Sequence, residues 1–481
     1  MHSTMLKLEN VEVSLGGVKI LAGISLEIGK GEQLAVLGAS GAGKTVLAET
    51  LGGRHSYSGS ISGSFSEAET LHRNVQLVDQ QHRFKNLSNQ GDFYYQQRYN
   101  AQDATGSITV AENLSDYPET GVNGFQQTEL IGLFHLGKLL TEPLIQLSNG
   151  ENKRLQIVKA LLTDHGLLIL DQPFTGLDAA GRQLLSAILN SLAERGEQMI
   201  LITSSRDIPP CFSRVVLMDQ GRIIREGSPA DFQSGTSSFT PLPPKEFPSR
   251  ILFTYPDFEY AVRMCNVNVV YDEKFILRSI DWEVKKGSCW SLSGPNGAGK
   301  STLLSLITGD NPQAYANEIY LFDRKRGTGE SIWEIKQKTG FLSPELHLFF
   351  DSSATAYHTL ASGFRDTIGL FRRLSAEQHE LVLEWLRFLD LDEYQDRPLS
   401  SFPAGIQRML LLGRAMIKRP PLLVLDEPCQ GLDQDHIEQV KDLISRYCRQ
   451  FSATLIFVSH YEEELPQCVN RFLRLQAGSI V

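Results

Sequence analysis

The sequence predicts a chain of two similar α/β domains, each built on a mainly parallel sheet. The first observation is that the motif G-x-x-x-x-G-K-[ST] occurs twice, as GASGAGKT at 38–45 and as GPNGAGKS at 294–301. The second is that other landmarks recur at a nearly constant spacing: an apolar strand ending in Asp171 and in Asp426, Gly-Leu-Asp at 176–178 and 431–433, and a glycine at 150 and 405. Recurrence over most of the chain indicates a duplicated domain.

The expected domains are 6–233 and 250–481, joined by a Ser- and Pro-rich linker at 234–249. Within each domain, short apolar strands alternate with amphipathic helices, which predicts a parallel α/β core. The opening segment at 7–13 alternates apolar and polar residues, which predicts an antiparallel β subdomain. Helix-period patterns between the first glycine-rich motif and Asp171 predict an inserted helical subdomain.

Composition and charge narrow the class of protein. The 481 residues leave room for roughly two to four domains. The formal net charge of −10 disfavours a chain whose main role is to bind the phosphate backbone of nucleic acid. No apolar run, such as that at 421–425, approaches the roughly 18 residues that span a bilayer, so we expect no membrane crossing.

Cysteine usage points to a reducing compartment. The cysteines contain no CxxC pair and are scattered along the chain: Cys211, Cys265, Cys289, Cys429, Cys448 and Cys468. This pattern predicts reduced thiols in the cytoplasm and no zinc site.

Each glycine-rich motif stands where a phosphate-binding loop is needed, between an apolar strand (34–37 or 290–293) and an apolar helical stretch. Glycines let backbone N–H groups surround a β-phosphate, the lysine reaches the β- and γ-oxygens, and the hydroxyl after it can bind Mg²⁺. A chance glycine-rich turn is the alternative, and two matches in equivalent settings argue against it. The predicted ATP-binding residues are Gly38, Ser40, Gly41, Gly43, Lys44 and Thr45 in the first loop, and Gly294, Asn296, Gly297, Gly299, Lys300, Ser301 and Thr302 in the second.

The phosphate loop, the segment Leu147-Ser-Asn-Gly-Glu151, the strand ending in Asp and the Gly-Leu-Asp triplet together resemble the ABC-type ATPase family, twice over. The resemblance covers nearly the whole chain. It implies that the two domains pair head-to-tail, so that each ATP contacts the phosphate loop of one domain and the signature segment, usually LSGGQ, of the other. It assigns Ser148 and Gly150 to ATP binding, and Thr45, Ser301, Asp171 and Asp426 to Mg²⁺. Gln80, after the strand at 75–78, matches the family's coupling-loop glutamine and is placed with the metal ligands; its counterpart in the second domain stays open, with Glu345 a candidate.

The two copies differ at the residue that follows the strand-end aspartate. In the family this residue is a glutamate that polarises the attacking water, and the second copy retains it as Glu427. The first copy has Gln172, whose neutral amide cannot accept a proton. Loss of general-base assistance costs roughly 10²–10⁴ in rate.

Two further family residues are present only in the second copy. The switch histidine that contacts the γ-phosphate matches His460, and the first copy has Ser204 or Ser205 there. The aromatic residue that stacks on adenine matches Tyr271, which corresponds to Leu15.

The signature segments show the opposite asymmetry. The first copy has Leu147-Ser-Asn-Gly-Glu151, whereas the second has Phe402-Pro-Ala-Gly-Ile406, in which Pro403 removes a hydroxyl and a backbone N–H. The segment at 399–401 is an alternative register that would supply a hydroxyl. With head-to-tail pairing, the chain is predicted to have one degenerate site and one working site, with Glu427, His460 and Lys300 as its catalytic residues.

The short linker and the segments at 343–347, 362–364 and 426–433 resemble the ModF group of tandem cassettes, which is linked to molybdate transport. This resemblance implies a cytoplasmic, energy-coupling ATPase at the inner face of the cell membrane, with separate transmembrane subunits. The alternatives are a soluble switch acting on ribosomes or nucleic acid, as in ABC-F or repair-type relatives, and a nucleotide-dependent scaffold. ABC-F proteins have a long charged linker, and 234–249 has only Lys245 and Glu246, which disfavours a ribosomal partner. The aromatic-rich loop from Gln80 to Tyr99 is the expected docking surface.

Overall fold

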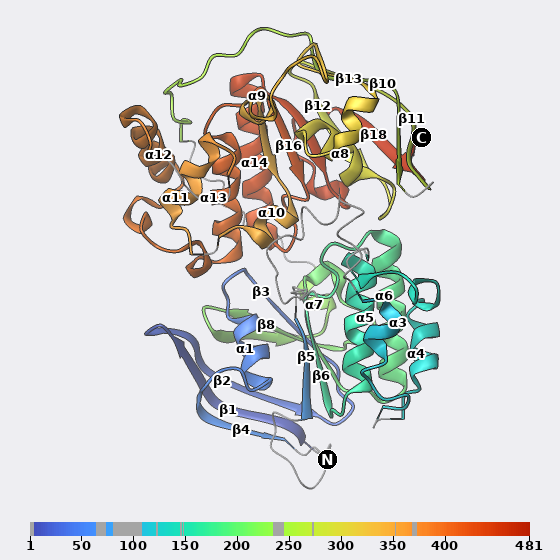
Figure 1. The fold of residues 1–481 in the computed structure, drawn as a ribbon. Helices are drawn as coiled ribbons and strands as arrows, with labels where there is room; N and C mark the ends of the chain where they lie inside the picture. The colour runs from blue at the N-terminus through green and yellow to red at the C-terminus, as the bar shows by residue number, and fades with distance from the viewer. Residues whose placement is uncertain are drawn as a thin grey trace. The chain divides into compact units, whose positions relative to one another are not determined.

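Parallel strands that are buried on both faces form the centre of each half of the chain (Figure 1). The chain divides into two units, Met1–Thr236 and Ser237–Val481. The computed structural model describes residues 4–63, 74–79, 108–121, 124–144, 147, 149–233, 245–271, 274–351, 353–367 and 373–481.

The described part of the first unit contains two sheets. The core sheet has the order β5-β6-β7-β3-β8-β9, and only its last pair is antiparallel: β5 (Val75–Val78), β6 (Leu167–Asp171), β7 (Met199–Ile202), β3 (Leu34–Gly38), β8 (Arg214–Asp219) and β9 (Arg222–Gly227). The other sheet is antiparallel, in the order β2 (Val18–Gly29), β1 (Thr4–Leu15) and β4 (Ser58–Gly63). Every residue of β6 and β7 is buried, as expected for a parallel sheet covered on both faces.

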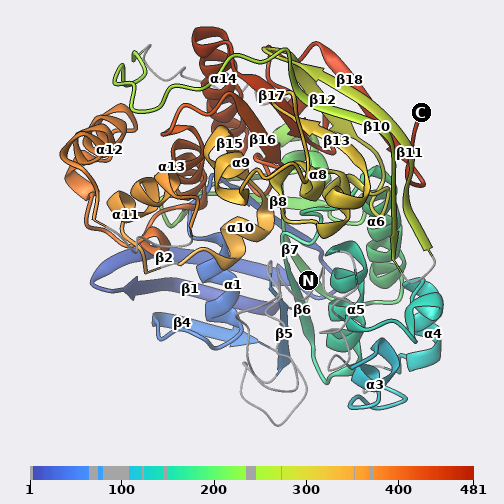
Figure 2. The same ribbon diagram turned by 45° about the horizontal axis from the view of Figure 1, so that its top comes forward.

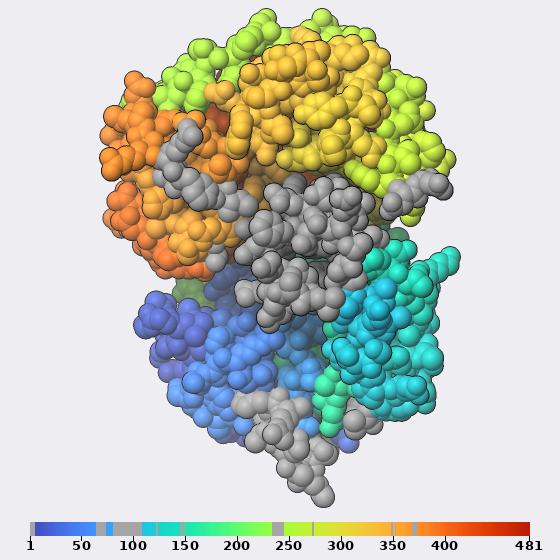
Figure 3. All heavy atoms as spheres, in the orientation of Figure 1, coloured from blue at the N-terminus to red at the C-terminus, as the bar shows by residue number. Residues whose placement is uncertain are grey.

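The helices of the first unit are α1 (Lys44–Leu51), α3 (Val110–Leu114), α4 (Gln127–Leu133), α5 (Asn149–Leu162), α6 (Ala179–Glu194) and α7 (Ala230–Gln233). Helices α3 to α5 lie between β5 and β6 in the chain and form the helical subdomain. In Figures 1 to 3 this subdomain, coloured cyan to green, and the blue antiparallel sheet occupy opposite sides of the unit.

The second unit repeats this arrangement. Its core sheet has the order β15 (Thr339–Leu342), β16 (Leu422–Asp426), β17 (Thr454–Val458), β12 (Cys289–Ser293), β18 (Arg471–Gln476) and β19 (Ser479–Ile480). Its antiparallel sheet has the order β11 (Lys274–Lys285), β10 (Tyr260–Tyr271), β13 (Glu318–Leu321) and β14 (Arg324–Lys325). Its helices are α8 (Lys300–Thr308), α9 (Ile332–Lys338), α10 (Pro344–Phe349), α11 (Ala356–Ala361), α12 (Ala376–Phe388), α13 (Ala404–Met416) and α14 (Gln434–Phe451).

The repeated Gly-Leu-Asp triplet has a structural role in both units. Asp178 is the N-cap of α6 and accepts a hydrogen bond from the Gly181 N–H, and Asp433 caps α14 in the same way through the His436 N–H. Capping of this kind stabilises a helix by about 1 kcal/mol.

The register of the parallel strands brings the expected site residues to one edge of each sheet. In the first unit, Ile202 pairs with both Val36 and Asp171. In the second, Val458 pairs with both Leu292 and Asp426. The phosphate loop, the strand-end aspartate and the chain after β7 or β17 therefore start at the same level of the sheet.

Part of the expected linker packs on the second unit. Phe247 is 3% exposed, and its ring lies 4.8 Å from that of Phe388 and 5.6 Å from those of Tyr447 and Phe451. Residues 234–244 lie outside the described residues.

The predicted fold class is confirmed: both units contain a parallel α/β core, an antiparallel β subdomain and a helical subdomain. No helix among the described ranges is long and apolar enough to span a bilayer.

Candidate functional site

Glycines of both phosphate loops have backbone conformations that other residues rarely adopt. Gly38 and Gly294 have φ values of 150° and 146°. A Cβ added to Gly38 would lie 2.3 Å from the Met218 carbonyl oxygen, and one added to Gly294 would lie 2.2 Å from that of Leu475. The backbone can therefore pass this close to the neighbouring strand only without a side chain.

The other loop residues follow the same pattern in both units. Gly43 and Gly299 are the N-caps of α1 and α8, with φ values of 94° and 99°. Gly41 and Gly297 also have positive φ, at 84° and 77°. The turns so formed contain Ser40 and Asn296, and Thr302 is the third residue of α8. The predicted residues of each loop thus lie in one compact turn between a strand and a helix.

Each loop curls around its own lysine. Lys44 Nζ donates to the carbonyl oxygens of Gly38 and Ala39 at 2.6 and 2.7 Å, and Lys300 Nζ does so to Gly294 and Pro295 at 2.7 and 3.1 Å. Both lysines are 8% exposed. A buried ammonium beside the N-terminus of a helix favours an anion, so the loops fit the phosphates of ATP.

Two of the predicted metal ligands of the first unit meet. Thr45 Oγ1 donates to Asp171 Oδ2 at 2.8 Å, and the buried Asp171 Oδ1 has no hydrogen-bond partner among the described residues. Burial raises the pKa of Asp171, while the Thr45 hydrogen bond and Lys44 act in the opposite direction. A hydroxyl beside a carboxylate with an unused oxygen fits a hard divalent cation such as Mg²⁺. Ser301 and Asp426 occupy the same positions on α8 and β16.

The residue after each strand-end aspartate lies in a strained turn. Gln172 and Glu427 both have a φ of 45°. Their N–H groups donate to Ile202 O at 2.9 Å and to Val458 O at 3.0 Å. A left-handed conformation of a non-glycine residue costs about 1–3 kcal/mol and is concentrated at functional sites. Both units hold this strain, and only the side chain differs.

Glu427 stands in a polar cluster. Its Oε2 accepts a hydrogen bond from Gln430 Nε2 at 2.8 Å, and its Oε1 lies 3.0 Å from His460 Nε2, although this contact lacks hydrogen-bond alignment. The side chains of His460 and Glu427 are 6% and 18% exposed, so the carboxylate is partly accessible.

The register resolves the open alternative at the switch histidine. Ile202 and Val458 are equivalent because each pairs with the strand-end aspartate, so Ser204 is the counterpart of His460. Ser204 Oγ donates to Asp207 Oδ2 at 2.8 Å. In the first unit a neutral amide and a hydroxyl thus replace the carboxylate and imidazole.

Hairpin pairing likewise shows which residue corresponds to Tyr271. Tyr271 pairs with Lys274 at the end of its hairpin, as Leu15 pairs with Val18. The Tyr271 hydroxyl accepts a hydrogen bond from Asn311 Nδ2 at 3.0 Å. Burial raises the pKa of Tyr271, against the opposing effect of the Asn311 hydrogen bond.

The two signature segments align on their glycines. Gly150 and Gly405 are the second residues of α5 and α13. In an alignment of the two copies on these glycines, Pro403 corresponds to Ser148. A Cβ on Gly405 would lie 2.1 Å from His436 Cδ2, and one on Gly150 would lie 2.9 Å from Leu177 Cδ2. Ser148 itself lies outside the described residues, as does Gln80 with the loop to Tyr99.

The sequence prediction missed two buried cations at equivalent positions on α5 and α13. Lys153 Nζ donates to Asp79 O at 2.5 Å, and burial lowers its pKa to about 8 against the attraction of Asp171. Arg408 Nη2 donates to Gln430 O at 3.3 Å, and burial lowers its pKa to about 10, against the attraction of Cys429 and Glu427. Lys153 follows Gly150 at the same spacing in the sequence as Arg408 follows Gly405, and this shared spacing was the signal that could have identified them.

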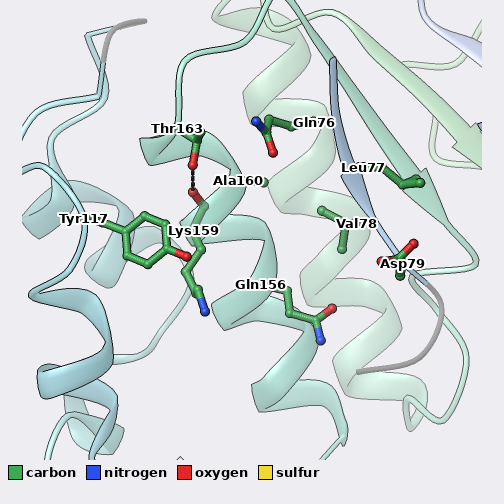
Figure 4. A pocket seen from close by; sticks show the side chains of 9 residues that line it. All are labelled: Gln76, Leu77, Val78, Asp79, Tyr117, Gln156, Lys159, Ala160 and Thr163. Carbon is green, nitrogen blue, oxygen red and sulfur yellow. Dashed lines mark hydrogen bonds between the residues drawn. The ribbon is translucent and has the colours of Figure 1, made fainter. Parts of the chain in front are cut away.

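A pocket of about 210 Å³ lies between β5 and α5 in the first unit (Figure 4). Its wall includes Asp79, Tyr117, Gln156 and Lys159. Lys159 Nζ lies 5.2 Å from the centroid of the Tyr117 ring. The pocket reaches the residue that precedes Gln80.

These features define the class of protein as an ATP-binding α/β protein with two phosphate-loop sites. The chain belongs to the ABC transporter family, whose model matches residues 21–175 and 277–430. The members of this family are ATPases, and so is this chain.

Two known proteins are similar to this chain over nearly the whole of their own length. The chain is 34% identical to the ABC transporter ATP-binding protein ModF of Escherichia coli, over 95% of this chain and 94% of that protein. It is 30% identical to an uncharacterized ABC transporter ATP-binding protein of Schizosaccharomyces pombe, over 95% of each. The resemblance to the ModF group of tandem cassettes is confirmed.

Solved structures share the fold. One described as ribosome-bound archaeal Pelota and ABCE1 matches 98% of this chain and 78% of that chain, with a TM-score of 0.63 and 16% identity. An RNase-L inhibitor matches 98% of this chain and 90% of its own, with a TM-score of 0.57 and 17% identity. At these identities the likeness concerns the fold alone.

The close backbone approach of the second loop gives a test. We expect Gly294→Ala to lower the affinity for MgATP at this site by at least about tenfold, because its Cβ would meet the Leu475 carbonyl. Gly297→Ala, where a Cβ meets open space, should have a smaller effect. Binding of a fluorescent ATP analogue measures both, with circular dichroism as the check of folding. Equal affinities in the two variants would contradict this account of the loop.

Proposed function

We propose that the chain hydrolyses ATP at one site, built on the second unit, and keeps a degenerate nucleotide site on the first. The observation that supports this most directly is the pair of identical strained turns at Gln172 and Glu427. The backbone is retained in both, yet Glu427 carries a carboxylate with the His460 imidazole beside it, whereas Gln172 carries a neutral amide.

In this proposal, Glu427 polarises the water that attacks the γ-phosphate, and Gln430 and His460 hold the carboxylate in place. Lys300 binds the β- and γ-oxygens. Ser301 and Asp426 would hold Mg²⁺, which would supply positive charge beside the transferring group. The accessible side of Glu427 leaves room for the water.

The two units are proposed to pair head-to-tail, as the family resemblance implies. Ser148 and Gly150 of the first unit would then complete the site of Lys300 and Glu427. The segment with Pro403 would complete the site of Lys44 and Gln172. This pairing joins the intact halves in one site and the altered halves in the other.

The output is proposed to be transport, with the chain attached to separate membrane subunits at the inner face of the cell membrane. The names of the ModF and Schizosaccharomyces relatives support an ATP-binding role in ABC transporters. The pocket beside Asp79 supports docking next to the coupling residue Gln80. The proposal that the cargo is of the molybdate type is supported by the resemblance to the ModF group alone. A ribosomal or nucleic-acid partner is the competing output.

Catalysis by one site gives the first test of this function. Glu427→Gln should reduce steady-state ATPase activity by about 10²-fold or more while ATP still binds. Gln172→Ala should change the rate by less than about twofold, because no general base is lost. Phosphate release by the full chain measures both rates. Equal losses in the two variants would refute the one-site proposal.

Head-to-tail pairing predicts unequal effects of two matched substitutions. Ser148→Arg should abolish most ATPase activity, because a bulky cation would occupy the γ-phosphate contact of the working site. Pro403→Arg should be milder, because it reaches the degenerate site. The measurement is again phosphate release, with nucleotide binding as the control for folding. A Pro403→Arg defect as large as that of Ser148→Arg would contradict the pairing.

The partner can be tested by fractionation of cell extracts. The full chain should sediment partly with membranes, and Lys159→Glu should release it by reversing the charge at the pocket beside Asp79. Lys138→Glu, an exposed lysine of the same subdomain outside the pocket, serves as the matched control. Sedimentation of the native chain with ribosomes, or a shift of duplex DNA, would overturn the transport proposal and leave the ATPase function standing.

A further inference from the structure

Three of the scattered cysteines meet in the second unit. Cys289 is the first residue of β12, Cys448 lies near the end of α14, and Cys468 comes shortly before β18. Their sulfur atoms all lie within 4.8 Å of one another, and none forms a disulfide. The sequence predicted reduced thiols and no zinc site, and strand and helix packing brings these three thiols together.

The spacing of the sulfur atoms is close to that of a metal site. Thiolate sulfurs bind zinc at about 2.3 Å, so three sulfurs around one ion lie roughly 3.8–4.0 Å apart. Shifts below about 1 Å would bring the three sulfurs of this cluster to that spacing. A disulfide, at about 2.0 Å, would need a much larger approach and would use only two of the three.

A buried hydroxyl lies beside the three thiols. Ser445 is 2% exposed and adjoins Cys468, and its Oγ has no hydrogen-bond partner among the residues that the structure describes. The thiolate is the form of cysteine that binds metals.

Two of the three cysteines are almost completely buried, and the third is more exposed. Cys289 and Cys448 are both 5% exposed, whereas Cys468 is only partly buried. An ion can therefore enter past Cys468 and be shielded from water once bound.

The first unit provides an internal comparison. Cys211 lies shortly before β8, as Cys468 lies shortly before β18. The position of Cys289, the first residue of β12, is occupied in the first unit by Gln33, which directly precedes β3. Gln33 hydrogen-bonds to the backbone at Glu197 and Met199, and burial raises the pKa of the solitary Cys211 to about 11. The fold therefore does not require a thiol at the position of Cys289, and a thiol at the position of Cys468 does not by itself create a cluster.

We propose that Cys289, Cys448 and Cys468 form a binding site for a thiophilic d¹⁰ metal ion, Zn²⁺ being the representative case. When the ion binds, the three cysteines coordinate it as thiolates and any thiol protons are released to solvent. A water or the Ser445 hydroxyl supplies the fourth ligand. The ion joins α14, the loop before β18 and the strand that leads to the phosphate loop at Gly294. It thereby stabilises the unit that carries Glu427, independently of whether that residue is catalytic.

The test uses the full chain, reduced and freed of metal, titrated with Co²⁺ as a spectroscopic substitute for Zn²⁺. We expect a thiolate-to-cobalt charge-transfer band that saturates at one equivalent and disappears on addition of Zn²⁺. Cys468→Ser should weaken binding by at least about 100-fold. Cys211→Ser is the matched control and should leave the titration unchanged.

A second measurement needs no variant. Zn²⁺ should slow alkylation of Cys468 in the native chain by at least about tenfold, and leave the rates of Cys211 and Cys265 unchanged. Absence of the cobalt band, an unchanged titration in Cys468→Ser, or equal protection of all cysteines would each overturn the proposal.

Discussion

The site geometry of each unit depends on the hydrogen-bonded register of three parallel strands. Val458 pairs with Leu292 on one side and with Asp426 on the other, and Ile202 takes the same place between Val36 and Asp171. Because these strands run parallel, the chain segments that follow them emerge at one edge of the sheet. A slip of one residue in any pair would turn Asp426 or its neighbour to the opposite face. The phosphate loop, the metal-binding carboxylate and the switch position all depend on this register.

The two units show that a backbone can be kept after its chemistry has changed. Gln172 retains the left-handed turn and the hydrogen bond to Ile202 that Glu427 makes to Val458. Substitution of one oxygen by an NH₂ group leaves the turn intact, since both side chains have the same length. What differs is the charge, and with it the ability to accept a proton.

The helical subdomains are tied to the cores by buried cations. Lys153 donates to the carbonyl of Asp79, which precedes Gln80, and Arg408 donates to that of Gln430, whose side chain holds Glu427. Burial of a charged side chain with few partners costs stability, and Arg408 leaves Nε and Nη1 without hydrogen bonds. These hydrogen bonds link α5 to the end of the segment after β5 and α13 to the turn that contains Glu427.

The sequence by itself determined the duplicated fold, both phosphate loops, the strand-end aspartates and the contrast between Glu427 and Gln172. These features are local: a glycine spacing, an apolar strand or a residue type at one position carries the information. Only the tertiary structure decided that Ser204 is the counterpart of His460, because strand pairing, rather than sequence spacing, sets that correspondence. The same holds for Lys153 and Arg408, whose roles arise from burial. Cys289, Cys448 and Cys468 are far apart in the sequence, and only the packing of α14 against β12 and the loop before β18 brings their thiols together.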